Sequence, residues 1–345
     1  MHLSNLRTGG IVVLAFFLTA LLILGGCGGS SAHPSSASAS FPVSPSTGST
    51  PAPVPSPTPN PSPSPTPAPG PNPTPIPSTQ HGPVVLVVEE NHGYSSVIGS
   101  TAMPYLNSLA QQYGLATQYF ANTHPSIGNY FEMTAGQIIT NDDGFNGPLG
   151  DDNLVRRLLQ GGKAWKAYAE SLPGVGYTGG DSGAYLHRHN PLSYFTDVTN
   201  SAVQRNNLVP FAQFASDLNN GQLPDFSFVT PNASHDAHDC PAGTGACLNA
   251  ADNWLQQNIG PLLSSPQFQQ GGLLVIVFDE AEDADASLGG GHIAMIVAGP
   301  LVKHGFQSSN QYQHQNLLKM IASYLGIDGN LGDAANASAM GEFFN

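Results

Sequence analysis

The stretch Gly272-Leu273-Leu274-Val275-Ile276-Val277-Phe278-Asp279-Glu280 decides the fold that this sequence predicts. A continuous apolar run of this length, rich in β-branched residues, is typical of a strand buried on both faces, as the strands of parallel sheets are. Two carboxylates follow where the run ends. Because open α/β sheets bind ligands beyond the carboxyl ends of their strands, the same stretch indicates a site.

Four further apolar runs predict strands, and segments with helical spacing alternate with them. The strands are expected at residues 83–88, 115–120, 226–230 and 292–298. Helices are expected at 103–113, 130–138, 153–159, 211–218, 251–259 and 312–325, and 164–169 could be a helix or a short strand. This alternation predicts an α/β fold, a three-layer sandwich with a mostly parallel central sheet.

Polar clusters follow three of these predicted strands. Glu90 and Asn91 follow the first strand, and Asn232 with the group around His235 follows residues 226–230. The third cluster is the acidic pair at 279–280. If the sheet is parallel, the three clusters meet at one edge, and several such clusters together indicate a site more strongly than any one of them.

A fourth strand leads into His124-Pro125-Ser126-Ile127-Gly128-Asn129-Tyr130. A serine between a strand and a helix is well placed to act as a nucleophile, and the free N–H groups of a helix start can hold an anion. Gly128 would let the backbone come close to a ligand. The alternative is that Ser126 only caps the helix.

The oxygen-bearing side chains suit one divalent metal ion. Carboxylate and amide oxygens of Glu90, Asn91, Asp279 and Glu280 are typical ligands of Ca²⁺, Mg²⁺ or Mn²⁺, and zinc is also compatible. Phosphoryl transfer needs positive charge against the developing oxyanions, and the motif segments contain only Arg188 as a fixed cation. A metal ion would supply that charge and activate the Ser126 hydroxyl.

Five motifs occur in an order that resembles a known family. They are Glu89-Glu90-Asn91-His92, the Ser126 stretch, Arg188-His189-Asn190-Pro191, Phe278-Asp279-Glu280 and Gly290-Gly291-His292. Together they resemble the bacterial phosphoesterase family of acid phosphatases and phosphatidylcholine-type phospholipases C, which belongs to the alkaline phosphatase-like superfamily. The resemblance spans about residues 83–327.

The resemblance implies a role for each matching residue. Ser126 would be a metal-bound nucleophile that forms a phosphoserine intermediate. Glu90, Asn91, Asp279 and Glu280 would complete the metal site, although some relatives carry Asp at the position of Glu280. The residues implied to bind the phosphoryl group or the substrate, or to protonate the leaving group, are His189, His238 or alternatively His235, His292, Asn129 and Asn190. Relatives commonly carry proline at the position of Gly128.

Several histidines and acidic residues also have structural interpretations. His292 could be a core histidine bonded to the backbone, and we expect His314 to be a surface residue at a helix start. His92 could orient a ligand or face solvent. The segment 141–143 could contact phosphate, but Asn and Asp are frequent turn formers and we prefer a turn.

Charge and cysteine usage limit the possible functions. All 23 acidic residues lie after residue 80, against eight lysines and arginines, so a nucleic-acid role through a basic face is not expected. Cys240 and Cys247 flank a short glycine-rich loop, which indicates a disulfide in an exported protein. A metal role for the pair is the alternative, although this spacing is unusual for zinc.

The first 80 residues predict export and attachment. Residues 1–26 resemble a signal peptide, and Leu24-Gly25-Gly26-Cys27 resembles a lipobox whose cysteine becomes lipidated. Residues 27–80 form a Pro/Ser/Thr-rich stalk, with 17 of the 30 prolines and no charged side chain between 28 and 80. We therefore expect a catalytic domain at 81–345, held at a membrane through a lipid anchor and facing the periplasm or the cell exterior.

The sequence thus predicts an acid phosphatase-like phosphomonoesterase that acts on a small phosphorylated substrate. A phospholipase C-type phosphodiesterase is the alternative within the same chemistry. A catalytically inactive surface binding protein is the alternative from another class.

Overall fold

The computed structural model describes residue 76 and residues 81–345. The predicted signal peptide, the lipidation site at Cys27 and all of the predicted stalk except residue 76 lie outside these residues. Within the part described, none of the helices has both the length and the apolar character needed to cross a membrane.

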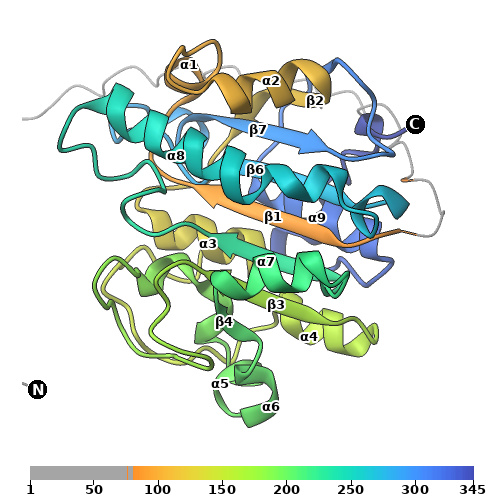
Figure 1. Cartoon of the computed structure of the whole chain (residues 1–345). Helices are drawn as coiled ribbons and strands as arrows, with labels where there is room; N and C mark the ends of the chain where they lie inside the picture. Colours follow the sequence, from red (N-terminus) through yellow and green to blue (C-terminus); the bar gives the residue numbers. More distant parts are fainter. Residues whose placement is uncertain (1–75, 77–80) are drawn as a thin grey trace, which may run out of the picture. The chain divides into compact units, whose positions relative to one another are not determined.

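An eight-stranded sheet forms the centre of residues 81–345 (Figure 1). Its spatial order is β4-β3-β5-β1-β6-β7-β2-β8. The strands are β1 (Val84–Glu89), β2 (Gly114–Phe120), β3 (Trp165–Ala169), β4 (Leu208–Pro210), β5 (Phe226–Thr230), β6 (Leu273–Phe278), β7 (His292–Ala298) and β8 (Phe306–Ser308). Strands β1, β5 and β6 are buried along their whole length, and the sequence of β6 is apolar throughout. Each buried Val, Leu or Ile side chain contributes about 1.5–3 kcal/mol to folding.

One strand runs against the others. β7 pairs antiparallel with both β6 and β2, whereas every other pair of neighbouring strands is parallel. A direct connection between neighbouring strands requires an antiparallel pair, and residues 279–291 make such a connection between β6 and β7. The prediction of a mostly parallel sheet is confirmed, and β7 begins at the edge where the other strands end.

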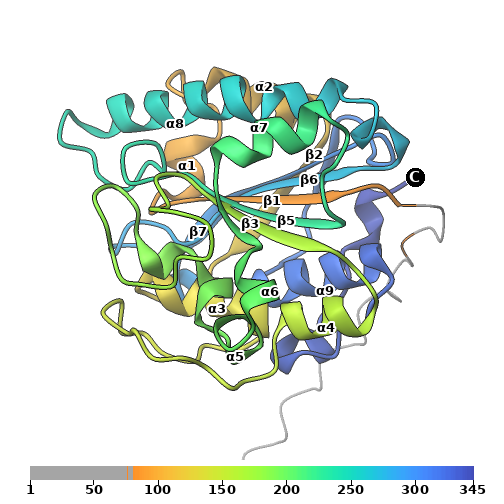
Figure 2. The same ribbon diagram turned by 60° about the horizontal axis from the view of Figure 1, so that its bottom comes forward.

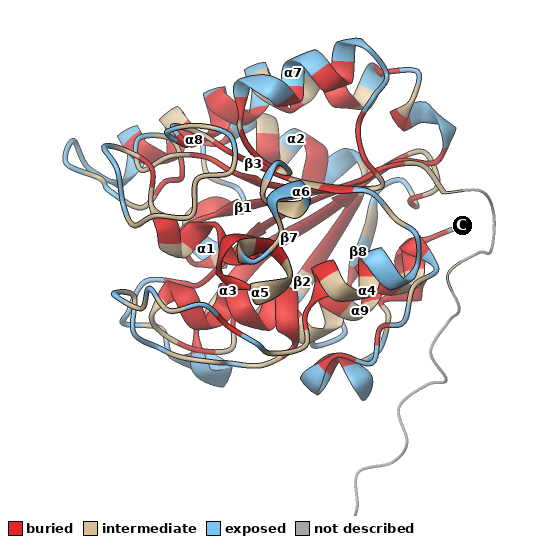
Figure 3. Cartoon of the chain, turned by 90° about the horizontal axis from the view of Figure 1, so that it is seen from below, coloured by how far each residue is buried: buried red, intermediate tan, exposed pale blue. Residues whose placement is uncertain are grey.

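Helices cover both faces of the sheet and make the sandwich three-layered (Figure 2). The helices α2, α7 and α8 lie on one face, and α3, α4 and α9 lie on the other. Figure 3 shows α7 and α8 with buried and exposed sides, whereas α3 is buried along its whole length. The helices are α1 (Tyr94–Val97), α2 (Pro104–Gln112), α3 (Ser126–Ala135), α4 (Leu154–Gln160), α5 (Thr196–Thr199), α6 (Ala202–Arg205), α7 (Ala212–Asn219), α8 (Thr244–Asn258) and α9 (His314–Leu325).

Two helices begin earlier than their apolar spacing predicted. Helix α3 begins at Ser126, directly after Pro125, and ends at Ala135, where it is capped by Gly136, whose φ of +69° suits glycine. Helix α8 begins at Thr244, seven residues before the expected start. Its first turns carry few apolar side chains, so the apolar spacing did not indicate this start. The segment 164–169 proves to be a strand, β3, and the three-residue strands β4 and β8 were too short to show a periodicity.

Candidate active site

The site begins at the adjacent ends of β1 and β6. Glu89 pairs in register with Phe278, so Glu90 and Asp279 leave the sheet side by side. The next residue, Asn91, has a φ of +50°, a left-handed conformation that asparagine tolerates better than most residues. This conformation lets the Asn91 backbone N–H donate a hydrogen bond of 3.1 Å to Asp279 Oδ1.

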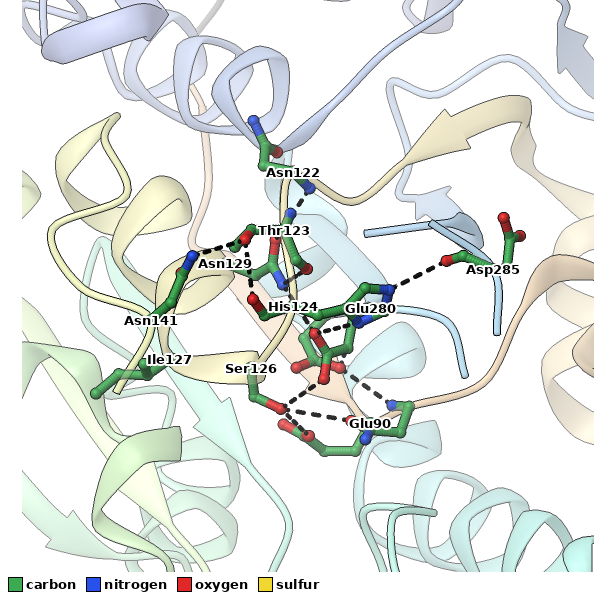
Figure 4. A network of polar contacts seen from close by, with 12 residues as sticks. Glu90, Asn122, Thr123, His124, Ser126, Ile127, Asn129, Asn141, Glu280 and Asp285 are labelled. Atoms are coloured by element: carbon green, nitrogen blue, oxygen red, sulfur yellow. Dashed lines mark hydrogen bonds and ion pairs between the residues drawn. The ribbon is translucent and has the colours of Figure 1, made fainter. Parts of the chain in front are cut away.

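Ser126, the first residue of α3, points at these two strand ends (Figure 4). Its Oγ lies 3.1 Å from Glu90 Oε2, 3.2 Å from Glu280 Oε1 and 3.4 Å from Asn91 Oδ1. A hydroxyl has one hydrogen to donate, yet three side-chain oxygens face this one. The single Ser126 hydroxyl hydrogen therefore cannot satisfy all three side-chain oxygens.

Burial makes this excess of oxygen costly. Glu90, Ser126, Asp279 and Glu280 are at most 2% exposed, and Asp279 Oδ2 has no hydrogen-bond partner. Burial, reinforced by the neighbouring carboxylates, raises the pKa of Glu90 and of Glu280 well above the usual range, and burial also raises the pKa of Asp279.

This donor set fits a divalent cation. Within residues 81–345, no lysine or arginine forms an ion pair with Glu90, Asp279 or Glu280. Carboxylate, amide and hydroxyl oxygens that converge without a cation are the donors that a hard metal ion prefers. The five residues predicted to bind metal, including Asn91 and Ser126, are thus brought together in the structure.

His189 lies beside Glu90. Its Nε2 is 3.3 Å from Glu90 Oε1, and its Nδ1 is 3.6 Å from Asp236 Oδ2. The ring stacks on Tyr130, with 5.2 Å between ring centroids, and the Tyr130 hydroxyl donates to Glu90. No role was predicted from the sequence for Asp236 or Tyr130, although Tyr130 lies in a quoted motif and Asp236 directly follows His235. Asp236 is buried and stands between two histidines of its segment, which was the available signal.

His124 and Asn129 hold the other side of the site. His124 Nδ1 is 2.9 Å from Glu280 Oε2, and its Nε2 is 3.1 Å from the Asp285 backbone carbonyl. Asn129 accepts hydrogen bonds from the N–H groups of Asn122 and Thr123, and donates to Thr123 O at 2.8 Å and Glu280 Oε2 at 3.4 Å. Asn129 thus fixes the turn before Ser126, and His124 was missed as a partner of Glu280.

Four predicted site residues have their described contacts elsewhere. His292 lies between the rings of Tyr94 and Phe120, and its Nε2 is 3.0 Å from the Thr117 carbonyl. The contacts of the remaining three are His235 with Glu170, His238 with Asp239, and Asn190 with the Tyr185 hydroxyl. None of the contacts described for these four residues is with Ser126 or the three acidic residues around it.

His314 differs from its prediction. It was expected at the surface, but it is fully buried at the start of α9. Its Nε2 lies 2.7 Å from the Asp279 backbone carbonyl and its Nδ1 lies 3.2 Å from the Tyr119 hydroxyl. Burial lowers the pKa of His314 to about 4, which favours the neutral ring, and its contact with the Asp279 carbonyl supports the end of β6. Sequence spacing could not show that the helix start turns inward.

Cys240 and Cys247 form the expected disulfide. Because the sulfurs are bonded to each other, neither is available as a thiolate ligand, which removes the alternative metal role for the pair. The Nε2 of His92 lies 3.6 Å from Cys240 Sγ and 3.5 Å from Cys247 Sγ. His92 is therefore buried against the disulfide and does not face solvent.

A solved structure with the same architecture identifies the fold. A protein in the alkaline phosphatase superfamily from Vibrio parahaemolyticus superposes with a TM-score of 0.54 over 76% of this chain and 72% of its own, at 16% identity. This likeness shows the fold alone. The fold is that of the alkaline phosphatase superfamily, and the oxygen-rich site lies at the carboxyl edge of its sheet.

The sequence relatives specify the family. The model of the phosphoesterase family matches residues 99–328. A phosphatidylinositol-3-phosphatase of Mycobacterium tuberculosis is 32% identical over 257 residues, which cover 74% of this chain and 80% of that protein. The chain belongs to the phosphoesterase family and is a phosphoric ester hydrolase. A phosphate-repressible acid phosphatase of Penicillium chrysogenum is 29% identical over 231 residues, which cover 64% of this chain but only 54% of that protein.

Proposed function

We propose that this chain is a metal-dependent phosphomonoesterase that works through a phosphoserine intermediate on Ser126. The observation that carries the proposal is the position of Ser126 Oγ, which lies within 3.4 Å of Glu90, Asn91 and Glu280. A divalent ion held by these residues and Asp279 would supply the positive charge that the acidic site lacks.

The chain's own residues divide the remaining work. Ser126 Oγ forms a bond to phosphorus while the ester oxygen leaves, and water then cleaves the phosphoserine to release phosphate. The hydroxyl proton has two carboxylate acceptors, on Glu90 and Glu280, at hydrogen-bond distance. His189 is buried beside Glu90 and is the best-placed histidine to exchange a proton at the site. For His235, His238 and His292 we propose contacts with the phosphoryl group or the leaving group. For Asn129 and Asn190 we propose contacts with the bound substrate.

Ser126→Ala tests the nucleophile. The variant removes the attacking oxygen and should reduce hydrolysis of a chromogenic phosphate monoester to background. Ser193→Ala, which removes another buried hydroxyl, is the matched control and should keep its turnover. Trapping of a phosphorylated Ser126 peptide at low pH would support the intermediate. Full activity of the Ser126 variant would rule out this residue as the nucleophile.

Chelation tests the metal separately. Treatment with excess chelator should silence turnover, and one divalent ion per chain should restore it. The same metal content should be lost in a Glu90→Gln variant, which keeps the shape of the side chain. Undiminished turnover in a chain shown to be metal-free would contradict the metal-dependent proposal.

The relatives favour a monoester as substrate. One is named a phosphatidylinositol-3-phosphatase and another an acid phosphatase, and these names describe the removal of a terminal phosphate. Parallel assays with a soluble monoester, a phosphorylated inositol lipid and a phosphodiester lipid would separate the two substrate types. Preference for the diester would support the phospholipase C alternative, and absence of turnover on all three would support the binding-protein alternative.

Export and lipid attachment belong to the same proposal. The sequence features that support them are the apolar leader, the lipobox ending at Cys27 and the uncharged proline-rich stalk. The full chain should fractionate with membranes, and Cys27→Ala should release it into the soluble fraction. Equal membrane association of both proteins would contradict the lipid anchor.

A further inference from the structure

The backbone N–H that follows the proposed nucleophile is already occupied. Ile127 N donates a hydrogen bond of 3.2 Å to Asp143 Oδ1. In enzymes with a nucleophile between a strand and a helix, the N–H after the nucleophile commonly holds an oxygen of the reacting group. Here a carboxylate of the chain itself holds that donor.

The same carboxylate faces the cation of the neighbouring motif. Arg188 Nε lies 3.7 Å from Asp143 Oδ2, and Arg188 Nη1 lies 3.5 Å from Asp181 Oδ2. Arg188 Nε is buried and has no hydrogen-bond partner, so it has a donor free for a closer oxygen. Asp143 therefore stands between two groups that suit a phosphoryl oxygen, one N–H and one guanidinium.

The segment that carries Asp143 packs against the start of α3 at Gly128. A Cβ at Gly128 would lie 2.3 Å from Asn141 Oδ1, so glycine makes room for this side chain. Asn141 Nδ2 in turn donates a 3.0 Å hydrogen bond to Thr123 Oγ1 (Figure 4). The segment 141–143 is thus anchored at Asn141, while the Asp143 side chain is 35% exposed.

We propose that Asp143 competes with the phosphoryl group: its carboxylate accepts from the Ile127 N–H and faces the Arg188 guanidinium until a phosphate ester displaces it. This inference rests on the proposed function, because it assigns the anion that these two donors receive. Displacement exchanges one anion for another, so the charge of Asp143 weakens the binding of every phosphoryl ligand. Asp143 therefore tunes substrate affinity without taking part in bond making.

The test measures binding of inorganic phosphate to the full chain by calorimetry, without any turnover. Asp143→Asn removes the charge but keeps an oxygen for the Ile127 N–H, and Asp143→Ala removes both. We expect phosphate to bind on the order of tenfold more tightly to the first variant, and more tightly again to the second. Asp142→Asn is the matched control and should bind like the parent chain. The Asp142 carboxylate lies in the same turn but accepts from Gly144 N–H and not from Ile127 N–H.

Arg188→Met completes a double-mutant cycle. Phosphate should bind more weakly to this variant, and the gain from Asp143→Asn should shrink in its background, because the freed guanidinium is missing. If Asp143 merely caps α3, both Asp143 variants lower the unfolding temperature and leave the phosphate affinity unchanged, which would overturn the inference. Absence of phosphate binding by the parent chain and by both variants would overturn it as well.

The outcomes separate this inference from the proposed function. Tighter phosphate binding by the Asp143 variants in a chain that hydrolyses no monoester would uphold the competitor and reject the phosphomonoesterase. Normal hydrolysis with unaltered phosphate affinity in both variants would reject the competitor alone. In the hydrolysis assay itself, we expect KM of Asp143→Asn to fall while kcat changes little.

Discussion

The buried carboxylate of Asp217 and the buried carboxylates around Ser126 have opposite electrostatic environments. Asp217, on α7, accepts hydrogen bonds from Lys166 Nζ at 2.6 Å, the Tyr168 hydroxyl at 2.7 Å and Gln213 Nε2 at 2.9 Å. Burial alone would raise the pKa of Asp217, but these hydrogen bonds and the lysine charge outweigh burial and lower it. The carboxylates around Ser126 have no such cation, and their pKa values are raised.

The difference separates a carboxylate that the fold satisfies from carboxylates that we propose to be functional. A buried charge whose hydrogen bonds and counter-charge come from the chain's own side chains needs no ligand to be stable. A group of buried oxygens that the fold leaves unsatisfied costs stability unless a ligand supplies the missing charge. Such unsatisfied groups are typical of sites that bind metal ions or carry out catalysis.

The largest expected effect is on the unsatisfied group. Glu280→Gln removes one charge and one oxygen ligand, so turnover of a chromogenic monoester should fall by about 100-fold or more. In the metal-free chain the same change should leave stability unchanged or raise it, because it relieves repulsion with Asp279. Asp283→Asn, an exposed neighbour, is the control and should keep full turnover. Unchanged turnover in the Glu280 variant would show that this carboxylate, like Asp217, is not needed for activity.

Substitution of Asp217, whose hydrogen bonds are satisfied within the chain, should change the free energy of unfolding. Asp217→Ala leaves Lys166 without its partner and should lower the free energy of unfolding in urea by about 3 kcal/mol. Because the folded pKa of Asp217 is below the usual 3.8, its contribution is present above about pH 4 and is lost as pH falls further. Turnover at saturating substrate should stay normal while the chain is folded. A loss of activity with unchanged stability would contradict the structural role of Asp217.

Glu132 sharpens the comparison, since it is buried without a cation but lies outside the site. Burial, with a contribution from Asp333, raises the pKa of Glu132 from 4.5 to about 7. A raised folded pKa means that stability is full below pH 4.5 and falls as pH rises through 7. Glu132→Gln should therefore gain about 2 kcal/mol relative to the parent chain between pH 5 and pH 8. Parallel pH profiles of unfolding would contradict this explanation.

The smallest effect is expected where the carboxylate is exposed. Asp328 is 46% exposed and pairs with Arg157 at 2.8 Å, and Arg157 also binds Asp152. Asp328→Asn should change the free energy of unfolding by no more than about 0.5 kcal/mol, because solvent screens the pair. A change several times larger would show that exposure does not separate these carboxylates.

The sequence predicted best where one local signal sufficed. An apolar run followed by polar residues located β1, β6 and the acidic edge, since burial along a strand requires such a run. The convergence of Glu90, Asn91, Ser126, Asp279 and Glu280 followed from parallel strand ends and from the resemblance to the phosphoesterase family.

It predicted less well where the fold decides the contacts. The partners of His235 and His292 depend on which loop and which ring lie opposite, and neither leaves a local pattern. His314 turns inward because α9 starts against the end of β6, which spacing cannot reveal. The contact between Asp143 and Ile127 joins residues 16 apart, one at the start of α3 and the other in the loop that follows this helix, and such a contact has no local sequence pattern.

The reversed direction of β7 has a practical consequence for engineering. Because β6 and β7 are neighbours running in opposite directions, both ends of the segment 281–291 stay at the rim of the site. Leu288, 48% exposed within this segment, offers a place to attach a fluorophore without changing the pairing of any strand. A label there would lie on the same loop as Asp285, whose backbone carbonyl contacts His124, so the loop could be turned into an optical sensor of site occupancy.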